Sequence, residues 1–358
     1  MPDILDDQKK EDEKSEIVIK MFNIADQGKG KTGALIALAA LGYKIRVLDF
    51  DNGSDILRNL LTSYDYPYRK YMEDNGIPLK GAIHIFTLQE KMVKHMTEDR
   101  YVPLAARAWK RMVAIMEGTD RESKENNFGS IDTWDNQTVL VFDTFGTCAE
   151  CAFFQQQELN NRLGQRMDDH GRDTGGAQNL LRDMLKKMFM AEIRCNIIFN
   201  SHIVFVDLSS GVAARPQAPN PNSTAQQLDS ISDPRGYPMA IGRALSPIAG
   251  KYFNNVLMMD EEGQGKSKRN KIYTNPMKGV SVKNSHPGGL NHSYNVETGL
   301  AEIFCALRGE PAPTALIEAC QKKKSTIPTA SASIKPINKA PIIAPKSTAL
   351  TLDQVQGN

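Results

Sequence analysis

Eight residues near the amino terminus have the types and the spacing to hold phosphate groups. Segment 25–32 reads ADQGKGKT; it follows a mostly apolar run and leads into the helical pattern GALIALAAL. Gly28 and Gly30 let successive backbone N–H groups turn toward phosphate oxygens, and the following helix aims its positive end at them. Lys31 can reach the β- and γ-oxygens as a point charge, and the Thr32 hydroxyl is a ligand for Mg²⁺, as the ending GKS/T requires. The segment therefore predicts a site for a nucleotide and Mg²⁺.

Nucleotide contacts are expected along this whole loop and one residue beyond it. The expected contacts are Ala25, Asp26, Gln27, Gly28, Lys29, Gly30, Lys31, Thr32 and Gly33. The loop departs once from the pattern GxxxxGKS/T, because Ala25 stands where the first glycine would fall. A methyl group there disfavours a strongly positive φ. The alternative interpretation of the segment is a Gly- and Lys-rich surface turn between a strand and a helix.

Acidic residues at the ends of two apolar runs are candidates for completing such a site. Asp143 ends the run VLVFD, where it can hold Mg²⁺ through water beside the loop. Asp49 and Asp51 in LDFDNG share one side of a strand by alternation, and Asp51 is the candidate for polarising an attacking water. Two alternatives stay open. Asp143 could cap the next helix, and the aspartates of LDFDNG could be ordinary strand-end and turn residues.

A further polar pair follows another apolar run, NIIFNSH. Asn200 and His202 stand where this strand would leave the sheet. A polar side chain there could sense the γ-phosphate and pass its loss to the segment that follows. A structural histidine is the alternative interpretation of His202.

The elements that must position these residues alternate between short apolar runs and helical patterns. Strands are expected at 44–51, 82–88, 138–143 and 196–202, and a helix at 177–193. This alternation predicts an α/β fold with a mostly parallel central sheet flanked by helices. After residue 255 the closely spaced runs NVLMMD, KIYT and VSVKN predict antiparallel strands that extend the sheet, closed by a helix at 297–307.

Length and composition suggest one large domain between two tails. The chain has 358 residues, and we expect a flexible charged tail at 1–16, one domain at 17–320 and a disordered basic tail at 321–358. Segment 208–238 is rich in Pro, Ser, Asn and Gln, and we expect a mobile loop there.

Cysteine usage and hydropathy bear on the compartment. Five cysteines without a secretory signal favour a reducing, cytoplasmic setting. No apolar stretch approaches the roughly 20 residues of a membrane-spanning helix. A net charge of +2 points to no particular partner.

The motifs ADQGKGKT, LDFD, VLVFD, FNSH and VSVKNSHPGG, in this order, resemble the RecA-like P-loop ATPases. The resemblance extends to the phage-encoded nucleotide-binding proteins of this class that assist recombination and single-strand annealing, and it covers roughly residues 16 to 308. It implies an ATPase that uses Mg²⁺ in phage DNA recombination, repair or replication, in the cytoplasm of a bacterial host cell. Implied partners are single-stranded DNA, replication or recombination proteins and further copies of the chain.

The resemblance also implies roles for single residues. Lys31 and Thr32 become the phosphate and Mg²⁺ residues, Asp143 the second metal acid, and Asp51 and His202 further catalytic residues. Lys283 stands where the family often has a lysine, which can reach the nucleotide of a neighbouring subunit. The family's arginine soon after this lysine is absent, and Ser285 and His286 stand there instead.

The nucleic-acid partner and the reaction both leave alternatives open. Candidates for contact with single-stranded DNA are Lys266, Lys268, Arg269 and Lys271, with Tyr273 nearby. A charged hairpin turn that is merely solvated is the alternative for this cluster. Two other functions remain open: a nucleotide-gated adaptor or loader that recruits a DNA-processing protein and hydrolyses little ATP, and a kinase for a small substrate.

Overall fold

The structure is a computed structural model that describes residues 17–122, 128–165, 171–206, 235–242, 244–263, 267–286 and 288–325. The tail expected at 1–16 lies outside the described residues, as do residues 208–234 of the expected mobile loop and 326–358 of the expected basic tail.

The core is an eight-stranded sheet with the order β12-β11-β10-β1-β7-β6-β2-β3. Its strands are β1 (Lys20–Ala25), β2 (Lys44–Asp49), β3 (Ile83–Thr87), β6 (Thr138–Asp143), β7 (Asn196–Ser201), β10 (Asn255–Glu262), β11 (Arg269–Tyr273) and β12 (Ser293–Asn295). The strands from β10 to β3 run parallel, whereas β11 and β12 are antiparallel additions at one edge. The predicted α/β fold class, a mostly parallel central sheet flanked by helices with antiparallel strands toward the C-terminus, is confirmed.

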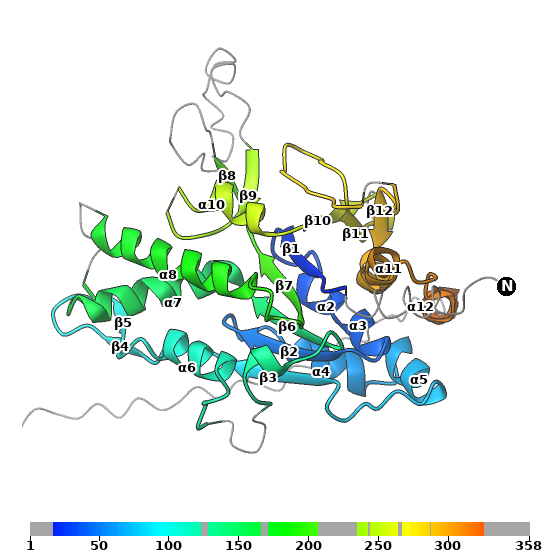
Figure 1. Cartoon of the computed structure of the whole chain (residues 1–358), viewed down its shortest axis with the longest axis horizontal. Coiled ribbons are helices and arrows are strands. Elements are labelled where there is room, and N and C mark those ends of the chain that lie inside the picture. Colours follow the sequence, from blue (N-terminus) through cyan, green and yellow to red (C-terminus); the bar gives the residue numbers. More distant parts are fainter. Residues whose placement is uncertain are drawn as a thin grey trace, which may run out of the picture.

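Helices cover both faces of this sheet (Figure 1). One face carries α6 (Arg107–Met116), α7 (Phe145–Leu159), α8 (Arg172–Met188) and the short α10 (Ser246–Ala249). The other carries α2 (Lys31–Ala34), α3 (Ile36–Ala40), α4 (Asp55–Thr62), α5 (Pro67–Asp74), α11 (Val296–Arg308) and α12 (Thr314–Ser325). Alternation along β6 supplies both cores, because Leu140 and Phe142 face the first set while Val139 and Val141 face the second.

Two small antiparallel pairs stand outside the main sheet. They are β4 (Met92–Lys94) with β5 (Tyr101–Pro103), and β8 (Ile203–Val206) with β9 (Arg235–Pro238). In the described part of the chain, every helix is too short or too polar to cross a membrane.

The prediction of a strand at VSVKN was wrong. Segment 280–283 makes only isolated bridges, from Val280 to Gly236 and Met277 and from Lys283 to Val256. The last strand of the sheet is β12. The cause lies just before this segment: Pro276 offers no N–H for a ladder, and Lys278 and Gly279 turn the chain with positive φ. A second difference is α12, a helix that begins before the expected tail boundary at 321 and ends at Ser325.

Candidate functional site

The loop after β1 lies at the carboxyl edge of the parallel strands, between the ends of β10 and β7. Gly28 has φ of 78° and Gly30 has φ of 90°, a left-handed backbone that other residues rarely adopt. A Cβ on Gly30 would also stand 2.9 Å from Cγ1 of Val296 in α11. Conformation and space therefore both require glycine at position 30.

Ala25 does not strain the loop. It is the last residue of β1, is fully buried and pairs with Met259 of β10. The described non-glycine residues with positive φ are Asn52, Asn161 and Lys278. The backbone at position 25 therefore does not need the glycine that the loop pattern places there.

Lys31 lies inside the loop. Its ammonium donates to the carbonyls of Ala25 at 2.9 Å and Asp26 at 3.0 Å, and only 6% of the residue is exposed. Burial lowers the pKa of Lys31, and the nearby charges of Asp143, Asp26 and Asp51 oppose that shift. A buried positive charge thus stands where the loop pattern predicts contact with phosphate.

Asp143 joins the loop to the sheet. Its Oδ2 accepts from the Thr32 hydroxyl at 2.7 Å, and its Oδ1 accepts from the side-chain amide of Asn200 at 3.2 Å. Burial raises the pKa of Asp143; the hydrogen bonds from Thr32 and Asn200 oppose the shift, whereas the charges of Asp49 and Asp51 add to it. The buried carboxylate is therefore costly to keep charged without a cation.

The donor set around Asp143 fits Mg²⁺. The Thr32 hydroxyl and the Asp143 carboxylate are hard oxygen ligands held within a hydrogen bond of each other, and the Ser54 hydroxyl lies 3.4 Å from the same Oδ2. Among the described residues, no group of three His, Cys, Asp or Glu side chains gathers as a metal site. Such a sparse protein set is typical of Mg²⁺ that is shared with phosphate oxygens and water.

A row of buried polar side chains extends this contact across the sheet. Asn23, Asn200 and Asp143 pair in register on β1, β7 and β6. The amide of Asn23 donates to Oδ1 of Asn200 at 3.2 Å. Asn23 was not among the predicted residues, although a signal existed: it interrupts the apolar strand KMFNIA, and a buried amide needs a partner.

The aspartates of LDFDNG divide into two roles. Asp49 accepts from the backbone N–H groups of Gly53 at 3.2 Å and Ser54 at 3.0 Å, so it has the turn role of the alternative interpretation. Asp51 accepts from the hydroxyls of Thr144, at 3.0 Å, and Thr147. The second aspartate is thus held against the start of α7.

Asp51 and His202 interact electrostatically with charged residues of the loop and with Asp143. Asp51 acts on the pKa of Lys31 and of Asp143, and burial followed by the charge of Lys31 lowers the pKa of His202. His202 directly follows β7, where its backbone carbonyl accepts from Met239 N at 2.8 Å. The structure thus brings together four predicted site residues, Lys31, Asp51, Asp143 and His202.

Lys29 has a different environment from Lys31. Its ammonium pairs with Asp260 at 3.5 Å and with Glu261 at 3.4 Å, both on β10. Asn270 of β11 approaches the same loop, with 3.5 Å from its amide nitrogen to the carbonyl of Gly28. These contacts tie the loop to the antiparallel edge of the sheet. Asp26, Gln27 and Gly28 are exposed, and Gly33 lies in α2.

Lys283 stands apart from the loop of its own chain. Its ammonium donates to the carbonyl of Phe253 at 2.8 Å, and its backbone pairs with Val256. Val256 is in register with Phe22, which precedes Ala25 by three residues. The backbone of Lys283 therefore lies about 10 Å along the strand from the start of the loop.

The candidates for contact with single-stranded DNA are mostly paired or buried. Lys268 pairs with Glu261 at 3.1 Å and Lys271 with Glu262 at 3.6 Å. Tyr273 is 4% exposed, which leaves little of its ring for a base to stack on. Lys266 lies outside the described residues.

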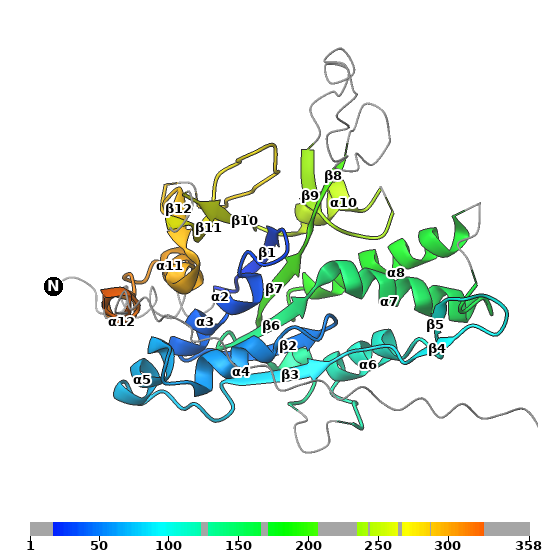
Figure 2. The same cartoon turned by 180° about the vertical axis from the view of Figure 1, so that it is seen from behind.

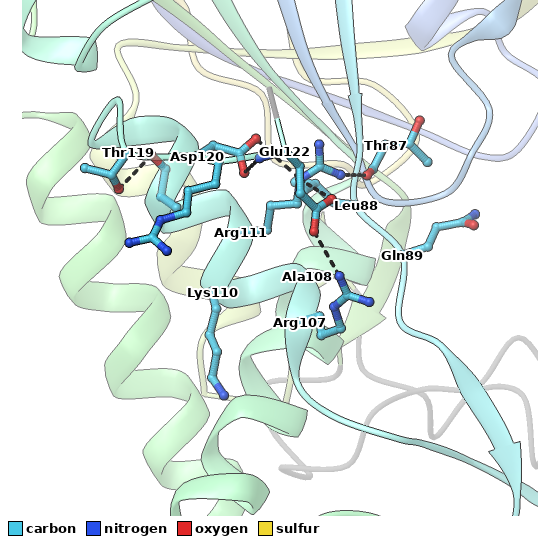
Figure 3. A pocket seen from close by; sticks show the side chains of 12 residues that line it. Thr87, Leu88, Gln89, Arg107, Ala108, Lys110, Arg111, Thr119, Asp120 and Glu122 are labelled. Atoms are coloured by element: carbon cyan, nitrogen blue, oxygen red, sulfur yellow. Dashed lines mark hydrogen bonds and ion pairs between the residues drawn. The ribbon is translucent and has the colours of Figure 1, made fainter. Parts of the chain in front are cut away.

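A separate pocket of about 500 Å³ lies where β3 ends against α6 (Figure 3). Two of its four lining cations pair with its two acids: Arg107 pairs with Glu122 at 2.9 Å, and Arg111 lies 3.5 Å from Asp120 and 3.3 Å from Glu122. Arg111 also donates to the carbonyl of Thr87 at 2.9 Å. The residues that line this pocket all come from segments 87–89 and 107–122 and none from the loop after β1, so the pocket is distinct from the predicted phosphate site.

Comparisons with known proteins find likeness only among solved structures, since no family model and no curated protein matches the chain. A KaiC-like protein from Pyrococcus horikoshii is similar over 75% of this chain and 82% of its own, with 13% identity and a TM-score of 0.34. The flagellar accessory protein FlaH from Methanocaldococcus jannaschii is similar over 77% and 83%, with 10% identity and a TM-score of 0.30. The function proposed below is therefore argued from the residues of this chain.

Proposed function

We propose that the chain binds ATP with Mg²⁺ at the loop after β1 and hydrolyses it. In this proposal the Lys31 ammonium exchanges the carbonyls of Ala25 and Asp26 for β- and γ-phosphate oxygens. Thr32 and Asp143 would hold Mg²⁺, which when bound neutralises charge on the phosphate oxygens.

The remaining residues have roles in orienting Asp143, polarising the attacking water and sensing the γ-phosphate. Asn200 fixes the rotamer of Asp143 through Oδ1 and leaves Oδ2 directed at Thr32. Asp51, steadied by the hydroxyls of Thr144 and Thr147, is the proposed group that polarises the attacking water. His202, whose lowered pKa favours the neutral ring, is the proposed sensor of the γ-phosphate.

The hydrogen bond between Thr32 and Asp143 carries this proposal, because it places a carboxylate on the hydroxyl of the phosphate loop. Replacing the carboxylate by its neutral amide, Asp143→Asn, is expected to lower ATP turnover about a hundredfold. Phosphate release at saturating MgATP measures the loss, and Asp65→Asn, at an exposed aspartate, is the control. Unchanged turnover in Asp143→Asn would remove the proposed metal role.

The cellular role that we propose is phage DNA recombination, repair or replication, with single-stranded DNA as a partner. The support is the order of motifs together with the Mg²⁺ site, and not the cluster 268–273, whose lysines are paired. We expect ATP turnover to rise on adding single-stranded oligonucleotide, and the effect to weaken as salt increases. No change in turnover at low salt would contradict this role.

We also propose that the chain acts as a homo-oligomer, with Lys283 reaching the nucleotide of a neighbouring copy. Its position away from its own loop supports this proposal. Lys283→Ala is expected to lower turnover at high protein concentration and to leave the affinity for nucleotide unchanged. Equal turnover of this variant and the natural chain at every concentration would contradict it.

A second candidate function is a nucleotide-gated adaptor that binds ATP, hydrolyses little of it and recruits a DNA-processing protein. The observation that favours it is the engagement of both Asp51 oxygens by threonine hydroxyls, which competes with a water. Thr147→Val frees one oxygen. A rise in turnover with this variant would support the adaptor function for the natural chain, and a fall would favour the ATPase.

A further inference from the structure

A groove of about 510 Å³ lies between α5 and α12, which pack side by side (Figures 1 and 2). One wall comes from α5 and the turn before it, with Tyr64, Tyr66 and Tyr71. The other wall comes from α12, with Ala315 and Ala319. The groove is therefore a hollow lined by aromatic rings on one side and methyl groups on the other.

The sequence of α12 explains why a hollow forms. Leu316 and Cys320, four residues apart, are buried in the core and hold the helix against the domain. Ala315 and Ala319 have the same spacing one position earlier, and their short side chains do not fill the space beside α5. Leu316 and Cys320 thus anchor the helix, while the small side chains of Ala315 and Ala319 leave a hollow beside them.

The aromatic wall is unusually accessible for side chains of this size. Tyr64 is 70% exposed and Tyr66 is 41% exposed. The guanidinium of Arg69 lies 4.0 Å from the centroid of the Tyr64 ring, which fixes the ring while leaving most of its surface in water. A gathered set of exposed rings in a hollow is typical of an interaction site.

The charges on the rim favour an occupant that is itself weakly charged. Lys70 and Lys322 line the groove together with Asp74 and Glu318, so the cations and the acids balance. A polyanion or a strongly basic segment would gain little from such a rim. An apolar, preordered peptide would gain most from the rings.

The chain carries a peptide rich in proline and isoleucine shortly after α12 ends. Residues 336–345 read PINKAPIIAP, with three prolines, three isoleucines and a single charge. Proline-rich sequence favours the polyproline II conformation, which loses little entropy on binding and is recognised by grooves lined with aromatic rings.

The connection is long enough for this peptide to reach the groove. Ten residues, 326–335, lie between the end of α12 and the segment, and they span about 33 Å when extended. The wall from Ala315 to Lys322 is about 11 Å long, at 1.5 Å per helical residue, and it ends three residues before Ser325. A tether of this length keeps the segment at an effective concentration of about 1 mM, so weak contacts suffice for occupancy.

We propose that segment 336–345 of this chain docks into its own groove between α5 and α12. Prolines and isoleucines of the segment lie against Tyr64 and Tyr66, and its course runs back along α12. The docked segment lies away from the phosphate loop, so it need not compete with nucleotide.

Photo-crosslinking in the full chain tests this proposal directly. Ile343 is replaced by p-benzoylphenylalanine, the protein is irradiated, and the crosslinked peptides are mapped by mass spectrometry. We expect crosslinks within one chain to 64–75 or 315–322, at a yield that does not change with protein concentration. Crosslinks between two chains, or to other surfaces, would overturn the proposal.

Matched tyrosine variants distinguish docking in the groove from non-specific contact with exposed tyrosines. Tyr64→Ser is expected to lower the yield at least about fivefold, and Tyr101→Ser, at a tyrosine of the same 70% exposure on β5, is expected to leave it unchanged. In the docking segment, the double variant Pro341→Gly and Pro345→Gly should lower the crosslinking yield. Pro328→Gly, in the connection between α12 and the segment, should leave this yield unchanged. Equal yields across all variants would overturn docking into this groove.

Discussion

At the scale of single residues, the Asp143 carboxylate is the point where several elements meet. It ends β6, accepts from Thr32 of the loop after β1, accepts from Asn200 of β7 and lies near the Ser54 hydroxyl before α4. A carboxylate with so many neutral donors around it is oriented strongly while its charge is only partly compensated. This arrangement suits a residue that acts when a cation is present.

The glycines of the loop allow a prediction with an internal control. Gly30→Ala forces a side chain into left-handed backbone and places a Cβ 2.9 Å from Val296, so we expect a loss of about 1–3 kcal/mol in the free energy of unfolding. Gly33→Ala lies in α2 with its new Cβ 3.8 Å from Leu60, an ordinary contact. We expect this second change to stabilise the protein by about 0.5–1 kcal/mol.

Urea unfolding of the two variants checks this prediction. Nucleotide affinity should fall in Gly30→Ala, because the loop cannot keep its shape. Equal free energies of unfolding for the two variants would show that position 30 has no special backbone requirement.

His202 gives a prediction about pH. Burial and the charge of Lys31 hold the pKa of His202 below 6.5, while Asp51, Asp143 and Asp26 oppose the shift. In the unfolded chain the ring protonates near pH 6.5. Its contribution to stability is therefore present above about pH 6.5 and is lost as the pH falls through the folded pKa.

The variant His202→Gln should remove this loss. We expect its free energy of unfolding to fall less steeply than that of the natural chain between about pH 7 and pH 5. Urea unfolding at several pH values measures the slope, with His286→Gln, at an exposed histidine, as the control. Identical slopes for His202→Gln and the natural chain would be the contrary result.

At the scale of elements, the site is made by strand ends in register. The row Asn23, Asn200, Asp143 and Asp49 crosses four neighbouring strands at one level of the sheet. Parallel strands bring their carboxyl ends to one edge, so residues that are distant in sequence become neighbours there. The loop after β1 opens at this same edge.

The end of β1 supplies a prediction about the missing glycine. Because Ala25 is an ordinary buried strand residue, Ala25→Gly restores the loop pattern without relieving any strain. We expect turnover to stay the same and the free energy of unfolding to drop by about 0.5–1 kcal/mol. A clear gain in turnover would show that the methyl group does limit the loop.

An element could be predicted from the sequence where neighbouring residues alone determine it. Apolar runs predict the strands that end at Asp143 and Ser201. The spacing of the glycines predicts the loop after β1. The role of VSVKN could not be predicted, because its valines look like a strand while Pro276 and the turn at Lys278 end the ladder before them. The partners of Asn23 depend on strand order, which a single chain's pattern does not specify.

At the scale of the whole molecule, the proposed nucleotide site and the groove occupy different places on one fold. The site lies at the carboxyl edge of the sheet, and the groove lies between two helices on the face that also carries α2 and α11 (Figure 2). The helices α5 and α11 are linked, since the Tyr68 hydroxyl donates to the carbonyl of Glu297 at 3.0 Å. Val296, the next residue toward the loop, is the one that Gly30 faces.

The central claim is that this fold turns over ATP with Lys31 as the phosphate-binding charge. The most direct test is phosphate release at saturating MgATP for the natural chain, for Lys31→Ala and for Lys80→Ala, which removes an exposed lysine elsewhere. The account predicts that Lys31→Ala loses at least about a hundredfold in turnover while Lys80→Ala loses none. Hydrolysis by Lys31→Ala at the natural rate would contradict it.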